Sequence, residues 1–179
     1  MIENIEARHI QEALRISKIR YEYLKSKMQI SPEINEVEGT GRAHRYSFRN
    51  VMQFALADRA NALGLSPKTT KDMLYFIERN PEVSDLGLFD PDKKNNLSIH
   101  YGIYEGKRFF KVTPTKQEGF YTGEGFEAFL IALKEKNDWG TIKQAFNLMK
   151  NKKFELSECE GFVTLNIGVI KDQIIKKLI

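Results

Sequence analysis

Apolar residues recur at helical spacing through residues 1–80. This period of three to four residues is typical of amphipathic helices that bury one side. It predicts four helices, over about 3–13, 18–28, 48–63 and 67–80. In the second helix, the pattern places the apolar side at Ile19, Tyr23 and Leu24 and leaves the lysines and arginines largely elsewhere.

Capping residues agree with these boundaries. Ser17, Ser47 and Ser66 each precede a predicted helix, where a hydroxyl can accept a hydrogen bond from a free backbone amide. Gly64 is a stop signal after the third helix, and Pro67 suits the first position of the fourth. The first two helices are joined by a tight turn and the second is basic, which is the helix-turn-helix plan.

The period changes after residue 96. Apolar and polar residues alternate over 97–104, and a second run follows at 108–112, which predicts an antiparallel hairpin. The later pattern predicts helices around 126–133 and 142–149, a strand at 162–167 and an amphipathic helix from Val169 with Ile170, Ile174 and Leu178 on its apolar side. We therefore predict an α+β protein whose sheet lies in its C-terminal part.

A segment rich in Asp, Asn, Pro and Gly separates the two patterns. We predict a helix-turn-helix domain at 1–80, a linker at 81–96 and an α+β domain at 97–179 that serves assembly or effector sensing. The last helix leaves two roles open, because its apolar side could form a homodimer contact or close the core of its own domain.

Positive charge is concentrated in one window. The 179-residue chain has a net charge of +4, and residues 15–49 hold eight Lys or Arg against four Glu, a surplus as large as that of the whole chain. Within this window, a glycine-hinged tip at 39–49 carries arginines, a histidine and aromatic residues without an acid. Clustered charge of this kind is the footprint expected of a phosphate-binding face.

Three motifs in order resemble the winged-helix DNA-binding domain of the MerR family. They are Ile19-Arg20-Tyr21, then Gly41-Arg42-Ala43-His44-Arg45-Tyr46-Ser47, then Ala62-Leu63-Gly64-Leu65-Ser66. The resemblance covers about a third of the chain. It implies a winged helix-turn-helix with a recognition helix at about 18–28 in the major groove and a wing at 39–46 on the phosphate backbone. The chain departs from family regulators after the fourth helix, where a hairpin replaces the long dimerising helix.

The resemblance implies roles for individual residues. Arg20 and Tyr21 match recognition-helix positions, and Arg45 and Tyr46 match the phosphate-contacting pair of the wing. Residues at the turn and the tip extend this surface. The predicted DNA-binding residues are Arg15, Ser17, Lys18, Arg20, Tyr21, Arg42, His44, Arg45 and Tyr46.

No other chemistry stands out in the sequence. His9, His44 and His100 have no metal-ligand spacing to carboxylates or thiols, and Cys159 lies between two glutamates that would raise its pKa. We expect no metal site, no cofactor and no catalytic residues, and hence no enzyme. The aromatic residues of the hairpin are expected to be core, with a small-molecule pocket as the alternative.

The sequence thus predicts a bacterial or phage transcriptional regulator that binds double-stranded DNA. It is expected in the cytoplasm, associated with the nucleoid and not with a membrane, because no apolar run approaches the length of a transmembrane helix. Two alternatives stay open: an architectural or excisionase-like DNA-binding factor of a mobile element, and a protein-interaction or antitoxin-like module.

Overall fold

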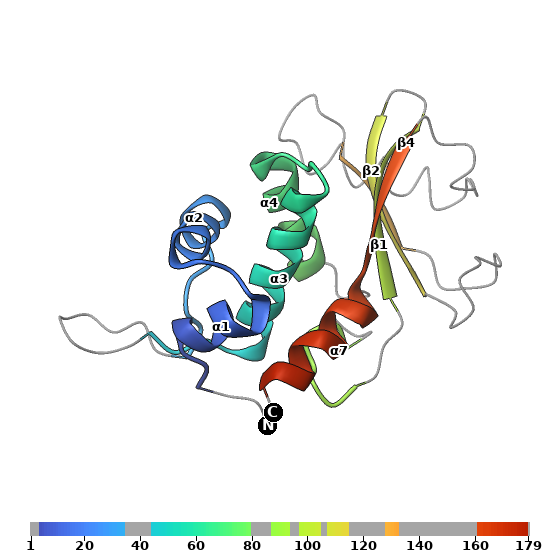
Figure 1. Ribbon diagram of the computed structural model, residues 1–179. Helices are drawn as coiled ribbons and strands as arrows, with labels where there is room; N and C mark the ends of the chain where they lie inside the picture. The colour runs from blue at the N-terminus through green and yellow to red at the C-terminus, as the bar shows by residue number, and fades with distance from the viewer. Residues whose placement is uncertain are drawn as a thin grey trace. The chain divides into compact units, whose positions relative to one another are not determined.

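The computed structural model describes residues 4–34, 44–79, 87–93, 97–104, 107–114, 128–132 and 161–178. The chain forms two compact units, one of Met1–Asn95 together with Gly168–Ile179, and one of Asn96–Ile167. The described part of the first unit is helical, and that of the second is an antiparallel sheet (Figure 1). The α+β class predicted from the sequence is therefore confirmed.

Helices α1 (Ala7–Leu14) and α2 (Lys18–Met28) are joined by three residues. Ser17 caps α2, because its hydroxyl accepts a hydrogen bond from the amide of Arg20 at 3.2 Å. The predicted apolar side of α2 is confirmed at Leu24 and wrong at Ile19, since the buried side chains are Tyr21, Leu24 and Met28, and Ile19 is 84% exposed. Positions 21, 24 and 28 lie on one helix face, at i, i+3 and i+7. This face is buried and includes the side chain of Tyr21, which is larger than that of Ile19.

Helices α3 (Phe48–Ala62) and α4 (Pro67–Arg79) follow the predicted caps. The hydroxyl of Ser47 accepts from the amide of Asn50 at 3.1 Å, and that of Ser66 accepts from Thr69 at 3.2 Å. Gly64 has φ +88°, a left-handed conformation that costs little without a side chain and that lets the chain turn between α3 and α4.

Helix α3 is the centre of the first unit. Ten of its fifteen residues are buried, and it contacts each of α1, α2 and α4. Phe54 on α3 stacks on Tyr21 with ring centroids 5.0 Å apart and meets Tyr46 edge to face at 5.9 Å. Aromatic pairs at these separations add about 0.5–1.5 kcal/mol each beyond area burial. This cluster fixes α2 and the segment before α3 against one helix.

Helix α7 (Ile167–Leu178) belongs to the first unit from Gly168 onward, although the sequence predicted a second domain running to residue 179. Its Lys171 is 1% exposed, and the ammonium donates to the backbone carbonyls of Gly87, Asp90 and Lys93. These bonds fasten α7 to the segment after α4. The domain boundary is therefore corrected at its C-terminal end, because long-range hydrogen bonds return the last helix to the first unit.

The second unit holds a four-stranded antiparallel sheet in the order β3-β2-β1-β4. Its strands are β1 (Leu97–Tyr104), β2 (Lys107–Pro114), β3 (Ala128–Ala132) and β4 (Gly161–Asn166). The predicted hairpin is confirmed, with Leu97 opposite Pro114 and Tyr104 opposite Lys107. Strand β4 lies on the other side of β1, where Thr164 bonds His100 at 2.8 Å.

The helix predicted around 126–133 is wrong, because Ala128–Ala132 is strand β3 and pairs with β2 from Arg108 to Val112. Cross-strand pairing with a segment far away in sequence outweighs local helical spacing at this edge. The helix predicted around 142–149 lies outside the described residues.

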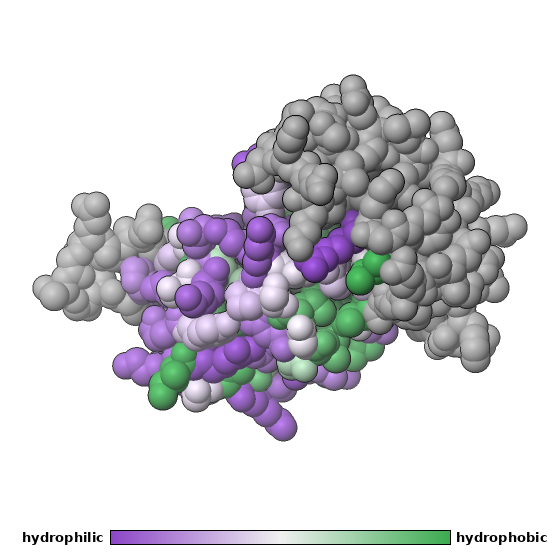
Figure 2. All heavy atoms as spheres, turned by 90° about the horizontal axis from the view of Figure 1, so that it is seen from above, coloured by the Kyte–Doolittle hydropathy of each residue, from purple (hydrophilic) through white to green (hydrophobic). Residues whose placement is uncertain are grey.

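None of the described helices combines the length and apolar character that crossing a bilayer requires. Hydrophilic side chains cover much of the described surface seen in Figure 2, with apolar side chains gathered in places between them. The large apolar side chains exposed in the described part are Ile19, Ile34, Leu63 and Val169.

Candidate nucleic-acid interface

The outward face of α2 lies opposite its buried stripe. At about 100° per residue, the centre of this face falls on Ile19, Glu22, Tyr23 and Ser26. Lys18 and Lys25 border it on one side, and Arg20 and Lys27 border it on the other. The result is a mixed apolar and polar strip with a cation along each edge.

Tyr21 and Tyr46 do not belong to this surface, although the resemblance implied DNA contacts for both. Tyr21 is 2% exposed and Tyr46 is fully buried. Their hydroxyls share a hydrogen bond of 2.5 Å, and burial, followed by this bond, raises the pKa of Tyr21. Both side chains are core residues that join α2 to the segment before α3, so the predicted contacts are corrected.

Arg20 is held against α3. Its Nε donates to Oδ1 of Asp58 at 2.9 Å, and its guanidinium lies 5.2 Å from the ring centre of Tyr23. The side chain is 32% exposed. Because the ion pair occupies Nε, that donor can reach a partner outside the molecule only by giving up Asp58.

Arg45 lies at the start of the described segment before α3. It forms an ion pair with Glu6 at 2.7 Å and donates to the carbonyl of Asn4 at 3.3 Å, with its side chain 36% exposed. The next residue forms an antiparallel bridge, in which Tyr46 and Ile5 exchange both backbone hydrogen bonds at 2.9 and 3.0 Å. The bridge therefore fixes the position of the backbone at Arg45.

His44 is half-buried, and its ring lies 6.5 Å from that of Tyr46. Its Nδ1 is buried and has no hydrogen-bond partner among the described residues. Arg42 and the glycines of the predicted wing tip lie outside the described residues. The wing itself stays a prediction.

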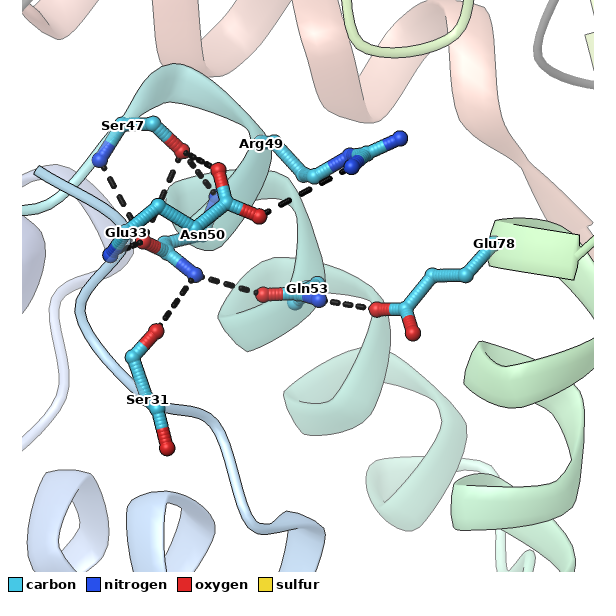
Figure 3. A network of polar contacts seen from close by, with 7 residues as sticks. All are labelled: Ser31, Glu33, Ser47, Arg49, Asn50, Gln53 and Glu78. Carbon is cyan, nitrogen blue, oxygen red and sulfur yellow. Dashed lines mark hydrogen bonds and ion pairs between the residues drawn. The ribbon is translucent and has the colours of Figure 1, made fainter.

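Asn50 holds together the two ends of the segment that contains the predicted wing (Figure 3). Its Oδ1 accepts from the amides of Glu33 at 3.1 Å and Ser47 at 3.3 Å, and its Nδ2 donates to the carbonyl of Ser31 at 3.0 Å. Asn50 is 1% exposed. One buried amide therefore sets the spacing between the chain leaving α2 and the chain entering α3.

The same network continues across α3. Nδ2 of Asn50 donates to Oε1 of Gln53 at 2.8 Å, and Gln53 in turn donates to Glu78 on α4 (Figure 3). Glu33 accepts from the hydroxyl of Ser47 at 2.5 Å and lies 3.8 Å from Arg49. Glu33 is thus matched by internal partners and opposes external phosphate less than the sequence suggests.

The remaining predicted contact residues surround the turn between α1 and α2. Ser17 and Lys18 are exposed at the start of α2. Arg15 is exposed and ends α1 in a left-handed conformation with φ 55°. In the described part of the chain, no three His, Cys, Asp or Glu side chains gather as metal ligands would.

Sequence reasoning missed the acidic partners Asp58 and Glu6, because both lie far along the chain from the arginines they bind. It also missed the exposure of Ile19. The i, i+3, i+7 spacing of Tyr21, Leu24 and Met28 was the available signal. It predicts that Tyr21 is buried and that Ile19 is exposed.

No family model matches the chain, and a search of curated proteins found no match.

Proposed function

We propose that the chain is a sequence-specific double-stranded DNA-binding regulator of the MerR-like winged helix-turn-helix type, with α2 as its recognition helix. The observation that carries the proposal is the outward face of α2. It presents Ile19 and Glu22 at its centre and cations at both edges.

This arrangement suits a major groove. A helix fits the groove, an aliphatic side chain can contact a thymine methyl, and a glutamate can accept from the amino group of cytosine. Cations at the edges of the helix are placed for the two phosphate backbones that border the groove. Ser17 and Lys18 lie at the N-terminal end of α2, the end that meets bases in helix-turn-helix proteins.

Arg45 supplies a second phosphate contact beside the predicted wing. Its ion pair with Glu6 is partly exposed, and pairs of this kind contribute about 0–1 kcal/mol. A phosphate oxygen can replace Glu6 at little cost, with release of counterions from the duplex.

Arg20 has a conditional role in this proposal. When it stays with Asp58 it orients α2 on α3, and when it leaves Asp58 it can reach a guanine edge. Arg20→Ala is expected to relax base preference at one position, whereas Arg20→Lys keeps the charge but loses the fork of donors. Unchanged preference in Arg20→Ala would restrict Arg20 to the structural role.

The sheet-bearing second unit then serves assembly or effector sensing. This part of the proposal is supported by its separation from the helical unit as a compact body.

Selection of bound sequences from random duplexes tests the proposal. The chain is expected to enrich one motif, and a palindromic motif would indicate a dimer. Retention of duplexes without enrichment, together with DNA bending, would favour an architectural factor. Absence of duplex retention at about 50 mM salt, where phosphate contacts are strongest, would contradict the proposal.

A further inference from the structure

A pocket of about 450 Å³ lies in the first unit where the end of α1, the end of α3 and α7 meet. Leu14 and Ile16 contribute apolar wall, and the polar wall comes from three elements. Arg15 follows α1, Asp58 and Arg59 belong to α3, and Gln173 and Lys177 belong to α7. Lys177 donates to the carbonyl of Ala13 at 2.6 Å, which fixes α7 beside α1.

The pocket carries a surplus of positive charge. Three cations line it, Arg15, Arg59 and Lys177, against the single carboxylate of Asp58. That carboxylate already accepts from Arg20 at 2.9 Å. Within the described residues, none of the three cations forms an ion pair with an acid.

Lys177 lies close enough to the other two cations for their charges to act on it. The pKa of Lys177 is lowered, first by desolvation and then by the charges of Arg15 and Arg59. Gln173 and Lys177 are four residues apart on α7, so an amide and an ammonium lie on the same side of the helix.

Helix ends explain part of this cluster but not all of it. Positive charge is favourable near the C-terminal ends of α1, α3 and α7, and Lys177 satisfies one such carbonyl. Capping does not require three cations without an acidic partner in the described structure to surround one hollow. An anion would remove the repulsion and use guanidinium donors that have no acidic partner in the described structure.

We propose that this pocket binds a phosphate group through Arg15, Arg59 and Lys177. A tetrahedral dianion matches the charge surplus, and guanidinium forks are the side chains best suited to its oxygens. The phosphate can come from a DNA backbone, because Arg15 precedes the recognition helix, or from a soluble phosphorylated compound. The inference does not rest on the proposed function, since free phosphate is the probe.

The experiment is a titration of the full chain with inorganic phosphate, followed by amide NMR at constant ionic strength, with chloride as the competing salt. Saturable changes in amide chemical shift are expected around residues 14–16, 59 and 173–177. In Arg59→Gln/Lys177→Gln the affinity should fall at least about tenfold. Arg59→Lys keeps the charge but loses the guanidinium fork, so its affinity should lie between that of Arg59→Gln and that of the wild type. Lys176→Gln removes one exposed charge from the same turn of α7 and should bind as the wild type does.

Shifts that follow ionic strength alone, or a double variant that is folded and binds phosphate as the wild type does, would overturn the inference. A second arm identifies the source. If Arg59→Gln also weakens duplex binding and phosphate displaces the duplex, the occupant is a DNA phosphate. If duplex binding is unaffected, or if no duplex binds at all, saturable phosphate binding assigns the pocket to a soluble compound.

Discussion

The hydroxyls of Tyr21 and Tyr46 meet in a hydrogen bond of 2.5 Å inside the first unit, and both side chains are buried. One residue belongs to α2, and the other forms the bridge to Ile5 just before α3. This bond and the contacts of both rings with Phe54 hold the proposed recognition helix and the base of the predicted wing to one scaffold.

Removing either hydroxyl should destabilise the fold. Tyr21→Phe leaves the hydroxyl of Tyr46 buried without a partner, which costs about 1–3 kcal/mol in the free energy of unfolding. Tyr21→Phe/Tyr46→Phe should cost less than the sum of the single changes, because the double variant leaves no orphaned hydroxyl. Urea unfolding measures all three. Additive single effects would show that the two hydroxyls do not interact.

Stability should fall at alkaline pH partly through Tyr21. Its pKa is raised in the folded protein, by burial first and the bond to Tyr46 second, whereas an unfolded chain ionises tyrosine near pH 10. Above about pH 10 the unfolded state releases this proton and the folded state keeps it, so stability falls by up to about 1.4 kcal/mol per pH unit. Tyr21→Phe should have a shallower decline. An identical decline in both proteins between pH 10 and 11 would contradict the prediction.

Asn50 should matter for DNA binding as well as for stability. Asn50→Ala leaves the amides of Glu33 and Ser47 and the carbonyl of Ser31 without this side chain, at a cost of about 1–3 kcal/mol or more. Duplex affinity of the folded fraction should fall, because the spacing at the base of the predicted wing is lost.

Asn61→Ala is the matched control for Asn50. Asn61 also lies on α3 and donates to Leu65 and Thr70. This variant should lose stability yet keep the duplex affinity of its folded fraction. Equal losses of affinity in the two variants would show that Asn50 acts on binding only through global stability.

Ile19 should read sequence without supporting the fold. Since Ile19 is 84% exposed, Ile19→Ser is expected to change the free energy of unfolding by less than about 0.5 kcal/mol. The wild type should lose affinity when one thymine of the selected site is replaced by uracil, which lacks the methyl group. The affinity of Ile19→Ser should not change on the same replacement. Leu63→Ser, at another exposed apolar residue, is the control. A wild type insensitive to every such replacement would contradict methyl recognition.

Local chemistry predicted the helical unit well. Ser17, Ser47 and Ser66 cap their helices, and Gly64 turns in the left-handed conformation, because caps and stops act within a few residues. The hairpin was equally readable, since its two strands are neighbours in sequence.

Long-range contacts account for the failures. Strand β3 is defined by pairing with β2, and α7 joins the first unit through the bonds of Lys171 to 87–93. The candidate site shows the same limit. Tyr21 was assigned to DNA by resemblance, but its environment depends on Phe54 and Tyr46, more than twenty positions further along the chain.

The proposal that the start of α2 and Arg45 contact one duplex together is tested most directly by the salt dependence of binding. The slope of log K against log salt should be shallower by about one unit in Lys18→Ala and in Arg45→Ala, and by about two in the double variant. Lys68→Ala, which removes an exposed lysine of α4, should leave the slope unchanged. A double variant whose slope equals that of the wild type would contradict the account.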